Sequence, residues 1–137
     1  RLSSIVRGSA DDFDILFGTR NPEEIYRKHI SPFCPIFICT AGAGHIFICT
    51  PTGTHEFIVP QIPAEEIVST VGAGDSFNAG FLCAMHRLSV RKADLPKMEH
   101  TQWQQLVENG IKYSSQVCRS QDNYIKCVAD KQNLANI

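Results

Sequence analysis

Apolar residues recur along the chain with two different periods, and these periods predict both helices and strands. From Ala73 to Leu88 the apolar positions stand three or four residues apart, which predicts an amphipathic helix. A second helix is predicted from Thr101, because the spacing of Thr101 to Gln104 is typical of a capping box. The apolar stripes consist of Phe77, Phe81, Ala84, Met85 and Leu88 in the first helix, and of Trp103, Leu106, Val107, Ile111, Ser114 and Val117 in the second.

Short runs of β-branched and aromatic residues predict the strands. Pro35 to Thr40 and His45 to Thr50 are two such runs, and residues 41–44 join them as the turn of a hairpin. Further strands are expected within residues 1–7, at 55–59 and at 67–68.

Two short helices are predicted between the first strand and the hairpin. Ser9 suits the N-cap of a helix over residues 10–17, which Gly18 ends. Asn21 followed by Pro22 is typical of the N-cap and first position of another helix, running to about residue 29. The connector over residues 87–98 looks polar, and residues 124–137 look polar and loosely held.

Composition and charge exclude several classes of partner. The length of 137 residues is that of a single domain, and 43% of the residues are hydrophobic. Thirteen basic and fourteen acidic residues leave a net charge of −1 without a basic block, so nucleic acid is not expected as a partner. No apolar run approaches the length of a membrane span, and no membrane association is expected.

Six cysteines are present, and none forms a C-x-x-C pair. Four of them lie in or beside apolar segments, which indicates reduced, buried thiols. We therefore expect a cytoplasmic protein without a disulfide framework.

The stretch best suited to chemistry is Ser-Thr-Val-Gly-Ala-Gly-Asp-Ser-Phe-Asn-Ala-Gly-Phe at residues 69–81. A glycine-rich turn here runs into a helix, and helix starts present unpaired N–H groups and a positive dipole to anions. Gly72 and Gly74 leave room for an anion beside that backbone. Asp75 would repel a resident anion, but it fits a reaction in which it takes a proton from the attacking group. A loop with a helix cap is the commoner interpretation of the tetrapeptide alone.

Two common nucleotide motifs do not match this stretch. No Gly-Lys-Ser/Thr follows at Walker spacing, and Phe77 stands where the dinucleotide fingerprint needs its third glycine.

The segment Thr70 to Phe81 resembles the C-terminal signature of the ribokinase or PfkB-type carbohydrate kinases. This resemblance implies ATP-dependent phosphorylation of a sugar hydroxyl, with ATP and Mg²⁺ as cofactors. Asp75 would be the general base that deprotonates the hydroxyl. The backbone amides of Gly72, Ala73 and Gly74 would form the anion hole for the transferring phosphoryl group.

The same family carries Asn-x-x-Glu at a helix start, followed by Leu-x-Gly. Residues 9–12 and 16–18 fall at the matching spacing, with Ser9 in place of the asparagine and Asp12 in place of the glutamate. The resemblance implies that Asp12 acts through water on magnesium. Residues 21–24 match the residue types of the Asn-x-x-Glu motif better, but they lie too close to the next strand. Taken alone, the acids at 11 and 12 are explained by the helix dipole.

Further positions resemble those that border ATP in the family. Thr40 and Gly42 match the Thr-x-Gly-x-x-Gly of a hairpin turn, although His45 stands at the second glycine. The end of the last helix, with Ser115 and Cys118, corresponds to the border of the adenine, as do Ser114 and the loop over residues 119–123. Ser69 replaces the aspartate of the family's monovalent-cation site, so activation by potassium is not implied.

The resemblance covers about residues 4–124 and matches only the C-terminal, nucleotide-binding half of the family's domain. The fold expected for residues 1–137 is therefore half of a ribokinase-like three-layer α/β/α fold, with an edge β-hairpin and without the N-terminal sugar-binding half and lid. An unpaired sheet edge favours association. We expect a homo-oligomer, or pairing with an N-terminal half. Two alternatives stay open, namely a non-catalytic nucleotide-binding fragment and a nucleoside or phosphosugar kinase of the same superfamily.

Overall fold

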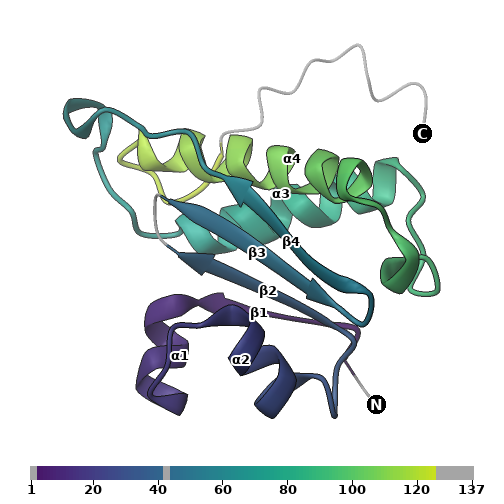
Figure 1. The fold of residues 1–137 in the computed structure, drawn as a ribbon. Helices are drawn as coiled ribbons and strands as arrows, with labels where there is room; N and C mark the ends of the chain where they lie inside the picture. Colours follow the sequence, from purple (N-terminus) through teal and green to yellow (C-terminus); the bar gives the residue numbers. More distant parts are fainter. Residues whose placement is uncertain (1–2, 42–43, 126–137) are drawn as a thin grey trace.

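Four strands form one mixed sheet in the computed structural model, which describes residues 3–41 and 44–125 (Figure 1). β1 (Ile5–Ser9) pairs in parallel with β2 (Ile36–Ala41). β3 (His45–Thr50) and β4 (Gly53–Ile58) then follow, each antiparallel to the strand before it. The predicted hairpin is confirmed as β2 and β3. The third predicted strand begins two residues early, at Gly53.

Helices cover both faces of this sheet, as Figure 1 shows. One face carries α1 (Ala10–Phe17), α2 (Pro22–Ile25) and the π-helical turn η1 (Tyr26–Ile30). The other face carries α3 (Ala73–Arg87) and α4 (His100–Cys118). The three-layer α/β/α arrangement expected from the sequence is therefore confirmed.

Each strand in the middle of the sheet contributes side chains to two hydrophobic cores, because successive side chains point to opposite faces. This is why residues 36–39 of β2 form a continuous apolar run and not an alternating one. The core under α3 and α4 contains Ile36, Ile38, Ile46 and Ile48, whereas the core under α1 and η1 contains Phe37, Cys39 and Cys49.

Two glycines let α3 and α4 approach each other closely. A Cβ atom on Gly80 would lie 2.6 Å from the backbone oxygen of Asn109, and one on Gly110 would lie 2.6 Å from Cε2 of Phe77. The Asn109 side chain also donates a hydrogen bond of 2.6 Å to the Gly80 oxygen. This close packing fixes the position of α3 over the sheet, and with it the glycine-rich turn at the start of α3.

The start of α4 differs from the prediction. Glu99 is the N-cap, and its capping box pairs it with Gln102. Thr101 lies inside the helix, so the predicted pairing with Gln104 is wrong. Both pairs have the required spacing, but the chain becomes helical at His100.

Residues 67–68 are not a strand, in contrast to the prediction. The Val68 amide donates a hydrogen bond of 2.8 Å to the backbone oxygen of Cys118, and the Ser69 amide donates to the same oxygen at 3.3 Å. The short 3₁₀ turn η2 (Ala64–Glu66) precedes this segment. The segment is thereby attached to the end of α4 and not to the sheet.

The connector between α3 and α4 contributes more to the core than its polar composition suggested. Leu95, in the 3₁₀ turn η3 (Leu95–Lys97), and Met98 are both buried. Leu88 is 45% exposed, because α3 ends one residue before it. Leu88 is therefore not part of the buried stripe of α3.

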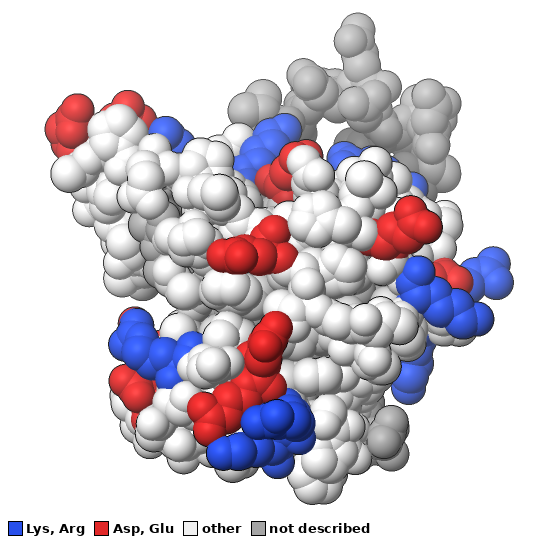
Figure 2. Space-filling model, in the orientation of Figure 1, with Lys and Arg blue, Asp and Glu red and all other residues white. Residues whose placement is uncertain are grey.

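Charges of both signs are mixed over the face in Figure 2. Two of the ion pairs join Arg20 to Asp11 at 2.6 Å and Lys28 to Glu24 at 2.7 Å. Among the described residues, none of the helices has the length and apolar character needed to cross a membrane.

β1 pairs with a neighbour on one side only, among the described residues. Its open edge exposes backbone donors and acceptors that another strand can pair with. We expect the chain to form dimers or larger species at tens of micromolar, roughly the range in which weak interfaces are populated. Multi-angle light scattering over a dilution series measures this, and a constant monomeric mass across that range would contradict it.

Three of the described cysteines, Cys34, Cys39 and Cys49, are buried, whereas Cys83 on α3 is exposed. Burial raises the pKa of the Cys39 and Cys49 thiols to about 11. Only about one in a thousand of these thiols is ionised at pH 8, and the thiolate is the reactive form.

Iodoacetamide at pH 8 should therefore alkylate Cys83 readily and leave Cys39 and Cys49 unmodified until urea unfolds the chain. Peptide mass spectrometry gives the extent at each position, and the urea sample is the control. Equal modification of Cys39 and Cys83 in the native chain would contradict the burial described here.

Candidate active site

Most of the residues predicted to carry chemistry meet at one edge of the sheet. β1 and β2 are parallel, so their carboxyl ends lie together, with Ser9 opposite Thr40. The start of α3 and the end of α4 lie at the same edge, near the end of β2 in Figure 1. Ligand sites of open α/β sheets form outside the carboxyl ends of the strands. This edge is therefore the candidate active site.

Gly72 forms the turn that begins α3. Its φ angle of +81° and ψ of −3° place it in the left-handed region as the N-cap, and no side chain caps the helix. A Cβ atom here would lie 2.8 Å from the backbone oxygen of Asn123. Both the conformation and the close approach of the loop after α4 require glycine at this position.

The amides of the turn are only partly used inside the protein. The Ala73 N–H donates a bond of 3.2 Å to the Thr70 oxygen. The amides of Gly72 and Gly74 have no acceptor in the part of the chain that the structure describes. A helix start with unpaired donors attracts anions. Of the three amides predicted to form an anion hole, Gly72 and Gly74 are thus available, whereas that of Ala73 is engaged in the turn.

Asp75 is the third residue of α3, and its side chain is exposed. Its carboxylate attracts the Arg7 guanidinium electrostatically. It forms no ion pair within the described residues. An exposed carboxylate one residue after the unpaired amides can meet both an acceptor hydroxyl and a phosphoryl group.

Ser9 and Asp12 form the capping box of α1. The Asp12 amide donates to the Ser9 hydroxyl at 3.1 Å, and the Ser9 amide donates to Asp12 Oδ2 at 3.0 Å. The Ser9 hydroxyl also donates to Asp12 Oδ2 at 2.6 Å. The hydrogen bonds from Ser9 lower the pKa of Asp12, with a smaller contribution from Arg7. The cap is confirmed, and the role of Asp12 toward magnesium stays a prediction.

Arg7 is a residue of this edge that the sequence reasoning missed. It lies on β1, and its Nη2 donates a hydrogen bond of 3.1 Å to the hydroxyl of Thr40. Its Nη1 would be 2.9 Å from a Cβ atom placed on Gly74. A single cation that directly follows the apolar pair Ile5 and Val6 in a short strand is the signal that could have pointed to it. Gly42, predicted beside Thr40, lies outside the described residues.

The end of α4 is fastened to the glycine-rich turn. The Cys118 oxygen accepts the amides of Val68 and Ser69, and Arg119 forms an ion pair of 2.7 Å with Glu66. Ser115 and Cys118 are partly exposed in the last turn of the helix. The structure thus brings the predicted adenine border next to Gly72.

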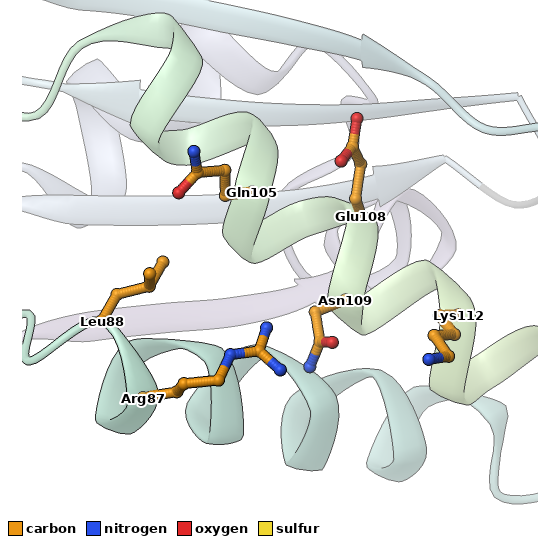
Figure 3. A pocket seen from close by; sticks show the side chains of 6 residues that line it. All are labelled: Arg87, Leu88, Gln105, Glu108, Asn109 and Lys112. Atoms are coloured by element: carbon orange, nitrogen blue, oxygen red, sulfur yellow. The ribbon is translucent and has the colours of Figure 1, made fainter.

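Two surface hollows lie away from this edge. One of about 320 Å³ lies between α3 and α4, with Arg87, Asn109 and Lys112 among its lining residues (Figure 3). Another of about 380 Å³ lies beside α2 and β4. Neither includes a residue of the candidate active site.

Comparison with known proteins matches the chain to a family of kinases. Residues 1–127 match the family described as pfkB family carbohydrate kinase. No curated protein matches the chain.

Several solved structures share the fold. Aminoimidazole riboside kinase from Salmonella enterica, complexed with aminoimidazole riboside and an ATP analog, is 24% identical with a TM-score of 0.68 over 88% of this chain. Fructokinase from Vibrio cholerae O395, with fructose, ADP and calcium bound, is 19% identical with a TM-score of 0.61 over 89%. Adenosine kinase from Anopheles gambiae is 21% identical with a TM-score of 0.61 over 86%. The matched part is 37%, 37% and 35% of those chains, respectively, so this chain spans little more than a third of their length.

Proposed function

Because the chain belongs to the pfkB family of carbohydrate kinases, we propose that it forms the nucleotide-binding and proton-accepting part of an ATP-dependent kinase acting on a sugar hydroxyl. One observation carries this proposal. The turn at the start of α3 leaves the Gly72 and Gly74 amides without an acceptor in the described residues, and the exposed carboxylate of Asp75 follows directly. An anion cradle beside a base is what phosphoryl transfer to a hydroxyl needs.

The reaction divides between these groups. ATP supplies the γ-phosphoryl group. Asp75 accepts the proton of the acceptor hydroxyl as the new O–P bond forms and the bond between the γ-phosphorus and the ADP oxygen breaks. The amides of Gly72 and Gly74 donate to the charge that develops on the transferring group, and the Ala73 amide joins them if its turn opens. Removing one such donor costs about 10²–10³-fold in rate.

The site fits a nucleotide with magnesium. The unpaired amides and the positive end of α3 suit phosphate groups. No group of three or more potential metal-binding side chains is present in the described part of the chain. Magnesium usually keeps several waters and is held by one or two carboxylates with substrate phosphates, so it needs no dedicated cage. Asp12 would act on it through water, with Ser9 holding Asp12 in place.

The other nucleotide contacts are proposed at the two sides of the turn. Thr40, at the end of β2, and Gly42 would border the phosphates. Ser115 and Cys118, at the end of α4, would border the adenine. The support for this arrangement is that Cys118 is hydrogen-bonded to the segment leading to Gly72, while Arg7 donates to Thr40 and lies next to Gly74.

The acceptor is proposed to be a sugar, free or within a nucleoside. The ligands or names of the structural neighbours include aminoimidazole riboside, fructose and adenosine. A nucleoside or phosphosugar kinase is therefore the nearest alternative. The buried free thiols of Cys34, Cys39 and Cys49 support a reducing compartment such as the cytoplasm.

A panel assay tests the function. ADP formation is measured with ATP, Mg²⁺ and, in turn, fructose, ribose, adenosine and aminoimidazole riboside. Turnover with a sugar supports the proposal, and turnover with a nucleoside alone supports the nearest alternative. Nucleotide binding by calorimetry without any turnover supports a non-catalytic nucleotide-binding fragment. A chain that shows no nucleotide binding and no turnover would contradict the proposal.

A further inference from the structure

Arg7 lies on β1 beneath the first turn of α3, and its side chain lies next to Thr40 on β2 and to Gly74 and Phe77 on α3. Its Nη2 donates to Thr40 at the end of β2, at 3.1 Å. Its Nη1 occupies the space next to Gly74, where a Cβ atom would approach to 2.9 Å. Its guanidinium carbon lies 5.7 Å from the centroid of the Phe77 ring. The side chain therefore fills the gap between the strand ends and the glycine-rich turn.

The placement of this cation is electrostatically unfavourable in the chain alone. The start of a helix carries a partial positive charge, so a guanidinium beside it is repelled unless an anion lies nearby. Partial burial adds to the cost and lowers the pKa of Arg7, although the guanidinium stays charged. Asp12 and Asp75 attract it from a distance.

The local partners do not satisfy this cation. Among the described residues Arg7 forms no ion pair. Its Nε is buried and has no hydrogen-bond partner there. Gly74 and Thr40 carry no charge, and Phe77 offers only the face of its ring. A guanidinium held in this way beside unpaired amides favours an anion on the turn.

We propose that Arg7 is a positioning residue for phosphoryl transfer, which holds the turn at Gly72–Gly74 against the ends of β1 and β2 and adds a positive charge behind it for the nucleotide phosphates. This inference rests on the proposed function. It predicts that the charge of Arg7 matters for phosphate-bearing ligands and not for the adenine or ribose. A purely structural role would predict equal sensitivity to any change of shape.

Two variants separate charge from shape. Arg7→Met removes the charge and keeps much of the length, whereas Arg7→Lys keeps the charge without the planar fork. Arg20→Met is the matched control, because Arg20 is an exposed arginine paired with Asp11 outside the site. Calorimetry measures the binding of ADP with Mg²⁺ and of adenosine to each protein.

Arg7→Met should weaken ADP binding by about tenfold or more, the loss expected for one charge-assisted interaction, and leave adenosine binding unchanged. Arg7→Lys should lose clearly less, and Arg20→Met should bind like the parent chain. Unchanged ADP affinity in Arg7→Met would overturn the proposal. Equal losses in Arg7→Met and Arg7→Lys, or an equal loss for adenosine, would overturn it too, because they assign Arg7 to the fold alone.

A measurement on the parent chain decides the matter if Arg7→Met does not fold. The Nε–H signal of Arg7 in a ¹⁵N-edited NMR spectrum should shift on addition of ADP with Mg²⁺ and stay in place with adenosine. The Nε–H signal of Arg20 is the internal control. An Arg7 Nε–H signal whose chemical shift stays the same when ADP is bound would overturn the proposal.

These results are distinguishable from a failure of the proposed function. A parent chain that binds ADP while the Arg7 variants bind it equally well refutes the role of Arg7 alone. A parent chain that binds neither ATP nor ADP refutes the proposed function itself.

Discussion

Replacing Asp75 with asparagine should lower kcat by about 10²–10⁴-fold, the contribution of a positioned general base, in a preparation that turns over. The amide keeps the shape of the side chain but cannot take the proton of the acceptor hydroxyl. Asp75 is exposed and forms no ion pair in the described part of the chain, so the fold should tolerate the change. ATP affinity should stay nearly the same or increase, because a negative charge is removed from beside the phosphates.

Steady-state kinetics give kcat, and calorimetry gives the affinity for ATP. Asp94→Asn is the matched control, because Asp94 is also an exposed aspartate but lies in the connector after α3, where it accepts the Arg91 amide. It should leave kcat unchanged. If Asp75→Asn turns over at the rate of the parent, the assignment of Asp75 as the base is wrong.

Replacing Gly72 with alanine should impair both the site and the fold. The left-handed φ of +81° costs a non-glycine residue roughly 1–2 kcal/mol. The new Cβ would also lie 2.8 Å from the Asn123 oxygen, so the loop after α4 must move. Both effects displace the Gly72 and Gly74 amides. We expect kcat/KM to fall by about 10²–10³-fold, as for the loss of an anion-hole donor.

Gly18→Ala provides the control for strain. Gly18 also has a positive φ of +68°, but nothing lies within 4 Å of a Cβ placed there. It ends α1 away from the turn, so alanine should lower the free energy of unfolding by about 1 kcal/mol and leave turnover unchanged. Thermal unfolding and initial rates on both variants separate the two effects. Normal turnover in Gly72→Ala would contradict the requirement for this turn geometry.

The sequence could predict those helices and strands that are determined by residues within them or next to them. Ser9 and Gly18 determine the bounds of α1 through a capping box and a left-handed C-cap, and both were expected from residue type alone. The runs that became β2 and β3 are apolar on both faces, which identifies buried strands. The position of Asp75 one residue after the glycine turn also follows from the motif by itself.

The rest depends on contacts between distant segments. Residues 67–68 look like a strand, but the amides of Val68 and Ser69 donate to the Cys118 oxygen at the end of α4, some fifty residues later. Glu99 and Thr101 are equally suited to begin α4 by local spacing, and the packing of Trp103 and Leu106 on the sheet accompanies the earlier start. The contact of Arg7 with Gly74 joins positions far apart in the chain, so no local pattern reveals it.

The availability of the Gly72 and Gly74 amides at the start of α3 is the central claim, and an amide NMR titration tests it most directly. A ¹H–¹⁵N spectrum of the chain is recorded while a non-hydrolysable ATP analogue is added with Mg²⁺. The Gly72 and Gly74 signals should shift along one saturable curve, while those of Gly18 and Gly53, in distant turns, stay in place. Unmoved Gly72 and Gly74 signals, with the analogue bound by calorimetry, would contradict the claim.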